Sequence, residues 1–279
     1  MRFGISTHLY HDRRLERAHL AQIAGAGFET IELFATRSHF DYRDYAAVTD
    51  LSGWLTETGL TLNSVHAPIT DVFAGPGPRT TYSNAVGAND RREAAVRETE
   101  AALGIARTIP FDILVLHLGT PTGMKHPDDN HRGAALRSLD EICRAAEPLG
   151  VRVAIEVIPN RLSDPASLVA ILDDELGGPA TGICLDFGHA HLLGDVADAV
   201  ETVAEHIIAT HVHDNHGRED EHLVPYRGSI PWDQALVTMQ KIGYEGTYLL
   251  ELAGSGAADG VLEEARRARE RFERTLAHA

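Results

Sequence analysis

The sequence predicts an α/β fold, namely a single (β/α)8 TIM barrel formed by residues 1–279. Short apolar runs alternate with longer amphipathic segments, and this alternation occurs eight times along the chain. No change in composition that would mark a linker interrupts the eight repeats. The length of 279 residues also suits one barrel, since barrels of this kind commonly have about 250 residues.

The expected strands are almost continuously apolar, as parallel strands are when both faces of the sheet are buried. In chain order they cover residues 2–7, 30–35, 60–69, 113–119, 151–159, 181–190, 207–214 and 247–252. The amphipathic segments after them cover residues 14–27, 45–59, 91–109, 133–150, 164–177, 195–207, 231–243 and 261–277. Gly150 and Gly243 lie where two of these helices are expected to end, and Pro165 lies where another begins.

A doubly wound open sheet is the alternative architecture. The glycine-rich dinucleotide fingerprint of that fold is absent after the first expected strand, so the main reason to prefer it is missing. One long loop, residues 70–90, follows the third strand and is rich in glycine and proline. It is either a lid over the barrel mouth or an insertion without a role.

Composition narrows the class of partner. The net charge of −16 argues against a nucleic acid, because proteins that bind nucleic acids usually present a basic surface to the phosphates. No apolar run reaches the roughly 18 residues that span a bilayer, and the N-terminus lacks the features of a signal peptide. Cys143 and Cys184 are too few for a disulfide framework. We therefore expect a cytoplasmic protein with reduced thiols and no membrane association.

Polar side chains collect where the expected strands end. In strand order from the third to the eighth they are His66, His117, Glu156, Asp186 with His189, His213 and Glu251. The C-terminal ends of barrel strands converge on one mouth, so these side chains should meet there. Any one of them alone is most simply a hydrogen-bonded structural residue, but seven from six consecutive strands predict a shared metal site.

Three further residues near the strand ends are expected to have lesser roles. His8 and Glu32 should contact a substrate or pack in the interior, and neither is expected to bind the metal. His211 lies two residues before His213, so it should support the site from below. The segment from His211 to Leu223, "HVHDNHGREDEHL", holds four histidines and four acids, and its later part is expected to fold back over the mouth.

The motifs "VHAP", "LHLG", "IEVIPN", "LDFGHAH", "HVHDN", "DEHL" and "LLEL" resemble those of the xylose-isomerase-like TIM-barrel superfamily, which contains sugar phosphate isomerases and epimerases and also endonuclease IV. The resemblance covers almost the whole chain. It implies one divalent metal held by Glu156, Asp186, His213 and Glu251. It also implies substrate contacts from His189, His66, His117 and a mouth arginine, for which Arg227 is the candidate beside Arg218.

The resemblance to endonuclease IV implies additional metal ligands. The positions that match its three-zinc cluster are His66, His117, His189, Asp220 and His222. The resemblance therefore implies that this chain has the ligand positions of the sugar epimerases and also those of endonuclease IV, so the number of metal ions stays open.

Two catalytic functions follow from these sites. With one ion, Mn, Mg or Co suits the oxygen-rich ligands, and Glu156 and Glu251 can exchange a proton with a carbohydrate through a metal-stabilised enediolate. With several ions, zinc foremost, the site can hydrolyse a phosphoester. A barrel that binds its ligand without turnover is the third possibility. We expect a small carbohydrate substrate, and the C-terminal helix at 261–277 can serve a homo-oligomer.

Overall fold

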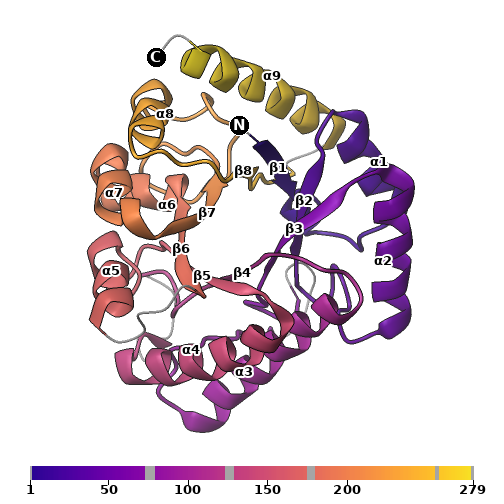
Figure 1. The fold of residues 1–279 in the computed structure, drawn as a ribbon, viewed down its shortest axis with the longest axis vertical. Coiled ribbons are helices and arrows are strands. Elements are labelled where there is room, and N and C mark those ends of the chain that lie inside the picture. The colour runs from indigo at the N-terminus through magenta and orange to yellow at the C-terminus, as the bar shows by residue number, and fades with distance from the viewer. Residues whose placement is uncertain (1, 73–78, 123–128, 175–179, 255–257, 278–279) are drawn as a thin grey trace.

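The computed structural model describes residues 2–72, 79–122, 129–174, 180–254 and 258–277. Its eight parallel strands pair in chain order and close into a barrel, with the helices arranged around the outside (Figure 1). The strands are β1 (Arg2–Ser6), β2 (Thr30–Phe34), β3 (Thr61–His66), β4 (Ile113–Leu116), β5 (Arg152–Glu156), β6 (Thr181–Asp186), β7 (Ile207–Val212) and β8 (Thr247–Leu250). The predicted fold class is confirmed.

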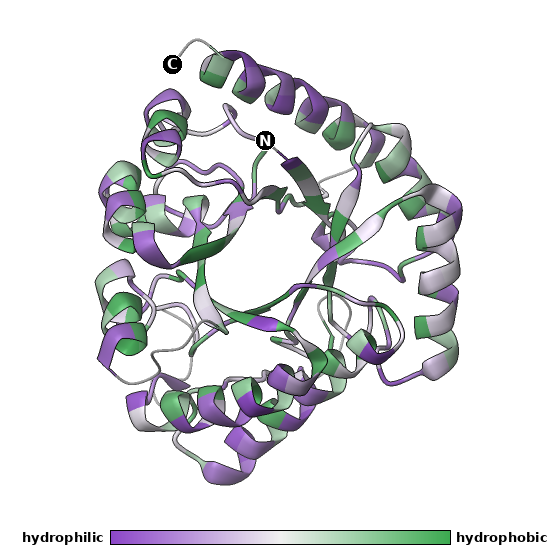
Figure 2. Cartoon of the chain, in the orientation of Figure 1, coloured by the Kyte–Doolittle hydropathy of each residue, from purple (hydrophilic) through white to green (hydrophobic). Residues whose placement is uncertain are grey.

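Helices follow the strands in sequence. They are α1 (Arg17–Gly25), α2 (Tyr45–Thr58), α3 (Asn89–Leu103), α4 (Arg132–Ala146), α5 (Pro165–Asp174), α6 (Phe187–Leu193), α7 (Val196–Val203), α8 (Trp232–Lys241) and α9 (Ala258–Ala277). In α9 the buried residues Leu262, Ala265, Ala268 and Phe272 recur every three or four positions, so they form one face of the helix. Figure 2 shows the hydrophilic residues of α9 mainly on its outer side.

The two faces of the strands pack differently. One large apolar cluster lies between strands and helices, and it includes Val153 and Ile155 of β5. Ala154, which lies between them, instead joins a small cluster with Ile113, Val115, Cys184 and Ala209. Since side chains alternate along a strand, this second cluster faces the barrel interior. The interior of the barrel is thus apolar on the β4–β7 side.

All eight strands end one to four residues earlier than predicted. The strand expected at 181–190 stops at Asp186, whose carboxylate accepts the backbone N–H of His189 (2.6 Å) and so caps α6. At this N-cap the chain leaves the strand and begins α6. The apolar residues after Asp186 had instead predicted that the strand continues. The strand expected at 60–69 ends at His66.

Residues 73–78 of the long loop at 70–90 lie outside the described residues, so the choice between a lid and an insertion stays a prediction. Its two flanks pair with each other through a bridge between Thr70 and Thr81. Every helix in the described part of the chain is too short or too polar to traverse a lipid bilayer.

Candidate metal centre

A cavity of about 300 Å³ opens at the carboxyl ends of the strands, which is the face where barrels of this kind place their chemistry. Most of the side chains predicted for the site line it, and these are His66, His117, Glu156, His189, Asp220, His222 and Glu251. The convergence expected from strand order is therefore present in the structure.

A buried group that reaches the cavity through Glu156 and Glu251 consists of Glu156, Asp186, His211 and Glu251. One ligand atom from each lies within 4.8 Å of the others, and all four residues are buried. His211 is at the centre of the group. Its Nδ1 lies 3.3 Å from Glu156 Oε1, 3.5 Å from Glu251 Oε2 and 3.8 Å from Asp186 Oδ2. We call these four residues the central group.

His213 does not take the place predicted for it in this group, because His211 occupies that place. The strand register explains the difference, since β6 and β7 pair with Asp186 opposite His211. His213 lies after the end of β7, where its Nε2 is 3.0 Å from Asp186 Oδ1 and its ring stacks on His222 at 4.1 Å. His213 therefore contacts Asp186 of the central group from the rim side.

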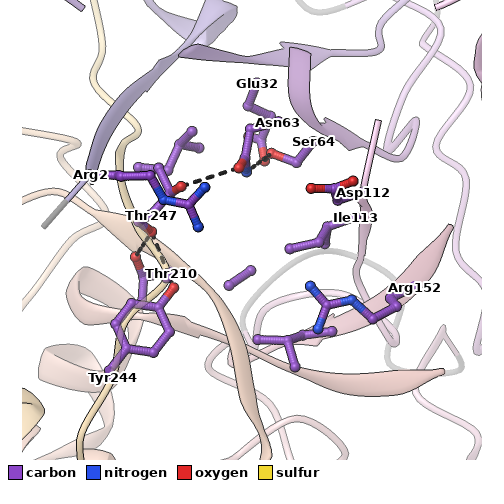
Figure 3. Close-up of a pocket in the computed structure, with 14 residues that line it drawn as sticks. Arg2, Glu32, Asn63, Ser64, Asp112, Ile113, Arg152, Thr210, Tyr244 and Thr247 are labelled. Carbon is purple, nitrogen blue, oxygen red and sulfur yellow. Dashed lines mark hydrogen bonds between the residues drawn. The ribbon is translucent and has the colours of Figure 1, made fainter. Parts of the chain in front are cut away.

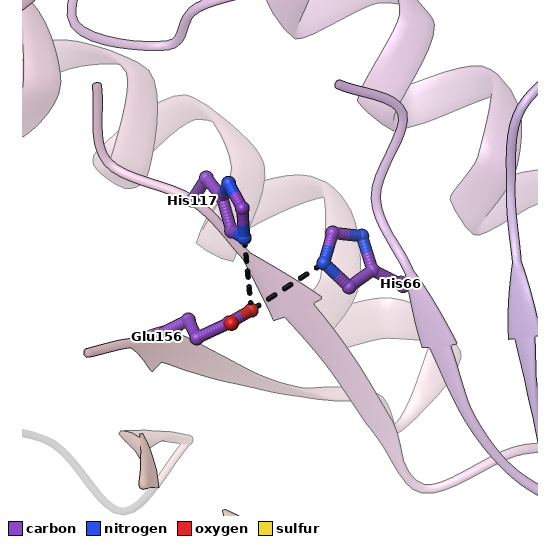
Figure 4. A group of neighbouring side chains, drawn as sticks. All are labelled: His66, His117 and Glu156. Carbon is purple, nitrogen blue, oxygen red and sulfur yellow. Dashed lines mark ion pairs between the residues drawn. The ribbon is translucent and has the colours of Figure 1, made fainter. Parts of the chain in front are cut away.

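A second group adjoins the central one through Glu156. His117 Nε2 lies 3.0 Å and His66 Nε2 lies 3.4 Å from Glu156 Oε2, and Figure 4 shows both imidazoles pointing toward that carboxylate. Ligand atoms of His66, His117 and Glu156 all lie within 4.8 Å of one another. The geometry is compatible with another cation that shares Glu156 with the central group.

A third set of side chains lies at the rim. Asp220 Oδ2 is 3.1 Å from His189 Nε2 and 3.2 Å from His222 Nε2. Asp220 and His222 reach this position because the chain after β7 turns back on itself, with Asp214 bridged to Leu223. The expectation that the "DEH" segment folds back over the mouth agrees with this arrangement.

The ionisable groups of the centre shift one another strongly. Burial raises the pKa of Glu156, but the positive charges of His117 and His211 outweigh burial and hold that pKa well below its usual range. Burial lowers the pKa of His189, but Asp186 and Asp220 raise it well above its usual value. These groups therefore favour ionised carboxylates beside protonated imidazoles when no metal is bound.

His222 and Asp220 form the clearest charged pair at the rim. Burial lowers the pKa of His222, yet Asp220 outweighs burial and raises the pKa of this imidazole to about 9. Burial in turn raises the pKa of Asp220, and the charge of His222 reverses this, so the pKa lies below its usual range. A metal ion that binds here has to displace the proton of His222.

Several buried polar atoms of the centre fit a divalent cation. In the described part of the chain, no hydrogen-bond donor with suitable geometry reaches either oxygen of Glu156, and His117 Nε2 and His211 Nδ1 are likewise without hydrogen-bond partners. Buried polar atoms rarely stay unpaired, so atoms that face one another without bonding are well placed as ligands of a common ion. The central group offers three carboxylates and one imidazole, which suits Mn, Mg or Co, and the histidine-rich groups suit zinc.

Arg227 is not among the residues that line the mouth cavity. Its guanidinium pairs with Glu264 of α9, with Nη2 2.6 Å from Oε1, and its side chain is 62% exposed. Arg227 therefore lies away from the mouth cavity, where it was predicted to contact a substrate. Arg79, which nothing in the sequence had singled out, is the arginine that lines the cavity within the described ranges.

Four of the other lining residues are apolar or aromatic, and we call them the apolar wall of the cavity. Phe34, Ile69, Tyr82 and Pro121 belong to this wall. His8 also lines the cavity, and its ring lies 4.7 Å from that of His222. The expectation that His8 contacts a substrate is thus compatible with its position, whereas Glu32 is not among the lining residues.

The chain is similar in sequence to one protein family and to several individual proteins. A family model described as xylose isomerase-like TIM barrel matches residues 20–274. An uncharacterized protein of Methanocaldococcus jannaschii is 27% identical over 270 residues, which cover 90% of this chain and 83% of that protein. A D-psicose 3-epimerase of Enterocloster bolteae is 28% identical over 128 residues, but this match covers only 43% of this chain and 40% of the epimerase.

Solved structures with similar folds cover nearly the full chain. A D-tagatose 3-epimerase-like protein has a TM-score of 0.80 at 24% identity and covers 99% of this chain and 97% of its own. A D-psicose 3-epimerase in the presence of D-fructose has a TM-score of 0.78 at 21% identity, with 99% of both chains covered. The IOLI protein with a binding zinc atom has a TM-score of 0.77 at 16% identity, with 98% of both chains covered. At these identities the likeness establishes the fold.

Proposed function

This chain belongs to the xylose isomerase-like TIM barrel family, and on this premise we propose that it is a divalent-metal-dependent isomerase or epimerase of a sugar or sugar phosphate. The observation that carries the proposal is the central group, in which Glu156 and Glu251 approach the same imidazole from different strands. Both glutamates also line a cavity of about 300 Å³, which is at the lower end of the range for small-molecule sites.

The central group would hold the ion through Glu156, Asp186, His211 and Glu251. When bound, the ion polarises a substrate carbonyl and makes the proton on the adjacent carbon easier to remove. One glutamate then removes that proton and the other returns a proton to the opposite face, or to the neighbouring carbon in an isomerisation. Each glutamate needs one oxygen free of the metal for this role.

The residues around the two glutamates can orient a sugar. His117 and His189 line the cavity next to Glu156 and can donate hydrogen bonds to substrate oxygens. Phe34 and Tyr82 on the apolar wall can pack against the C–H groups of the ring. The ketohexose epimerases among the structural relatives support a substrate of this size.

The decisive experiment follows solvent deuterium into D-fructose, D-tagatose and D-psicose with the Mn²⁺- or Co²⁺-loaded protein. We expect incorporation at one carbon next to the carbonyl, and we expect Glu251→Gln to abolish it. Glu263→Gln is the control, because Glu263 pairs with Arg266 and Arg267 on α9 and does not line the cavity. No incorporation into these ketoses or their phosphates by metal-loaded protein would reject the proposal.

Hydrolysis of a phosphoester is the second candidate function. It is favoured by the two additional ligand sets, His66 with His117 and Asp220 with His222, which flank the central group. Several ions placed in this way can activate a water and stabilise a leaving oxygen. The net charge of −16 argues against DNA as the substrate.

Elemental analysis separates the two functions. One Mn-, Mg- or Co-type ion per chain supports proton transfer. Two or three zinc ions per chain, together with release of phosphate from a small phosphate ester, would support hydrolysis instead.

A further inference from the structure

A fourth buried carboxylate lies beneath the central group, and the proposed proton transfer does not use it. Glu32 of β2 is fully buried. Its Oε1 accepts a hydrogen bond from the hydroxyl of Ser6 (3.2 Å), and its Oε2 accepts one from the hydroxyl of Ser64 (2.9 Å). His211 Nε2 lies 3.2 Å from the same Oε2. Burial of a charged carboxylate is unfavourable unless other groups compensate for it, so a glutamate held in this position is expected to have a specific role.

The strand register fixes Glu32 in this place. Ser6 of β1 pairs with Glu32, and Glu32 pairs with Ser64 of β3, so the two hydroxyls flank the carboxylate from neighbouring strands. The support continues below, because the side-chain amide of Asn63 donates to the Ser64 hydroxyl (3.3 Å) and accepts from the hydroxyl of Thr247 (3.2 Å). Figure 3 shows Glu32, Asn63 and Ser64 side by side at a small polar cavity of about 60 Å³.

His211 links this carboxylate to the central group. Its Nε2 faces Glu32, whereas its Nδ1 faces Glu156 and Glu251 at 3.3 and 3.5 Å. An imidazole that binds a metal through one nitrogen carries its remaining proton on the other nitrogen. With a carboxylate oxygen 3.2 Å from Nε2, that proton belongs on Nε2 and the lone pair of Nδ1 points into the central group.

We propose that Glu32 is a positioning residue of the metal centre, which holds the proton of His211 on Nε2 and fixes the ring so that Nδ1 faces the central group. The inference rests on the metal site of the proposed function and extends it by one residue. Glu32 does not line the mouth cavity, so it acts through His211 and has no contact with the substrate there.

Glu32→Gln tests the proposal with Co²⁺ binding as the readout, measured by isothermal titration calorimetry on the otherwise native chain. A glutamine can turn its amide nitrogen toward His211, which would move the imidazole proton to Nδ1. We expect Co²⁺ to bind about 10–100-fold more weakly, the usual effect of losing a carboxylate partner of a metal-bound histidine. Glu98→Gln, a buried glutamate elsewhere, should leave the affinity within about twofold of native.

A double-mutant cycle distinguishes positioning from general damage. In a chain that carries His211→Asn, Glu32→Gln should have almost no further effect on Co²⁺ affinity, because the residue it acts through is already gone. The same 10–100-fold loss in both backgrounds would overturn the proposal, as would native affinity in the single variant.

If Glu32→Gln does not fold, the paired Ser6→Ala and Ser64→Ala substitutions replace it, since they keep the carboxylate but remove the hydroxyls that hold it. We expect this pair to weaken Co²⁺ binding severalfold, and unchanged binding would overturn the proposal. A native chain that binds no divalent ion rejects the proposed function as well, whereas a native chain that binds Co²⁺ no better than Glu32→Gln rejects only the role of Glu32.

Discussion

Replacement of Asp214 by asparagine tests how the rim of the candidate metal centre is held in place. Asp214 is fully buried and follows His213 directly. Its Oδ1 accepts the backbone N–H groups of Asn215 (2.9 Å) and Ile230 (3.1 Å). Its Oδ2 accepts the backbone N–H of Tyr226 (2.8 Å) and the indole N–H of Trp232 (2.8 Å). One carboxylate therefore ties together both ends of the loop that carries Asp220 and His222.

The expected loss in the free energy of unfolding follows from the four N–H groups that donate to Asp214. Asparagine keeps one oxygen, so whichever way its amide is turned, two of the four donors lose their acceptor and face an NH₂ group. A buried donor left unpaired costs about 1–3 kcal/mol, so Asp214→Asn should lower the free energy of unfolding by about 2–6 kcal/mol.

Urea unfolding followed by far-UV circular dichroism measures this change at pH 7 in the presence of a chelator. Asp195→Asn is the matched control, because Asp195 also accepts two backbone N–H groups but lies exposed at the start of α7, where asparagine caps as well as aspartate. It should change the free energy of unfolding by less than about 0.5 kcal/mol. A loss of under about 1 kcal/mol in Asp214→Asn would refute the argument from unpaired donors.

Two further predictions concern the imidazoles. Loss of a residue that only supports a metal ligand weakens metal binding by up to about 100-fold. His211→Asn should therefore weaken Co²⁺ binding by more than about 100-fold, and His213→Asn by less, in the same titration. A larger effect of His213→Asn than of His211→Asn would show that His213, and not His211, binds the ion. The pKa of His222, raised to about 9 in the folded chain, means that this imidazole stabilises the metal-free protein fully below about pH 6.5 and that the contribution fades as the pH rises to 9. Urea unfolding with a chelator at pH 6 and pH 9.5 should show a loss on the order of 3 kcal/mol that His222→Asn removes, and equal losses in both chains would contradict it.

Much of the site could be predicted from the sequence because the barrel topology makes strand order a guide to position. His66, Glu156 and Asp186 each end a strand, and His117 and Glu251 each follow one directly. Parallel strands of a closed barrel bring their C-terminal ends to one mouth, so knowing the strands is enough to gather these side chains. No information on packing between distant residues is needed for this step.

The arginine at the mouth could not be found in the same way. Arg227 lies on the loop after β7, but Glu264 of α9, 37 positions away, draws its guanidinium to the outer surface. Arg79 lines the cavity from a loop whose sequence, rich in glycine and proline, predicts no position for a side chain. Both outcomes depend on how a loop packs against elements far away in the chain, which periodicity does not encode.

The exchange of His213 for His211 has a geometric cause of its own. His211 is on β7 and His213 lies just beyond its end, so they differ in depth by about 6.6 Å, and of the two only His211 brings a ring nitrogen within 3.5 Å of both Glu156 and Glu251 and so belongs to the central group. Which one belongs depends on how β6 pairs with β7, and this pairing shifts between Ile183 and Cys184 so that Asp186 comes opposite His211. A register shift is a property of two strands together, and neither strand alone reveals it. The histidines of the segment that begins at His211 therefore divide by depth, with His211 among the carboxylates inside the barrel and His213 and His222 stacked at its rim.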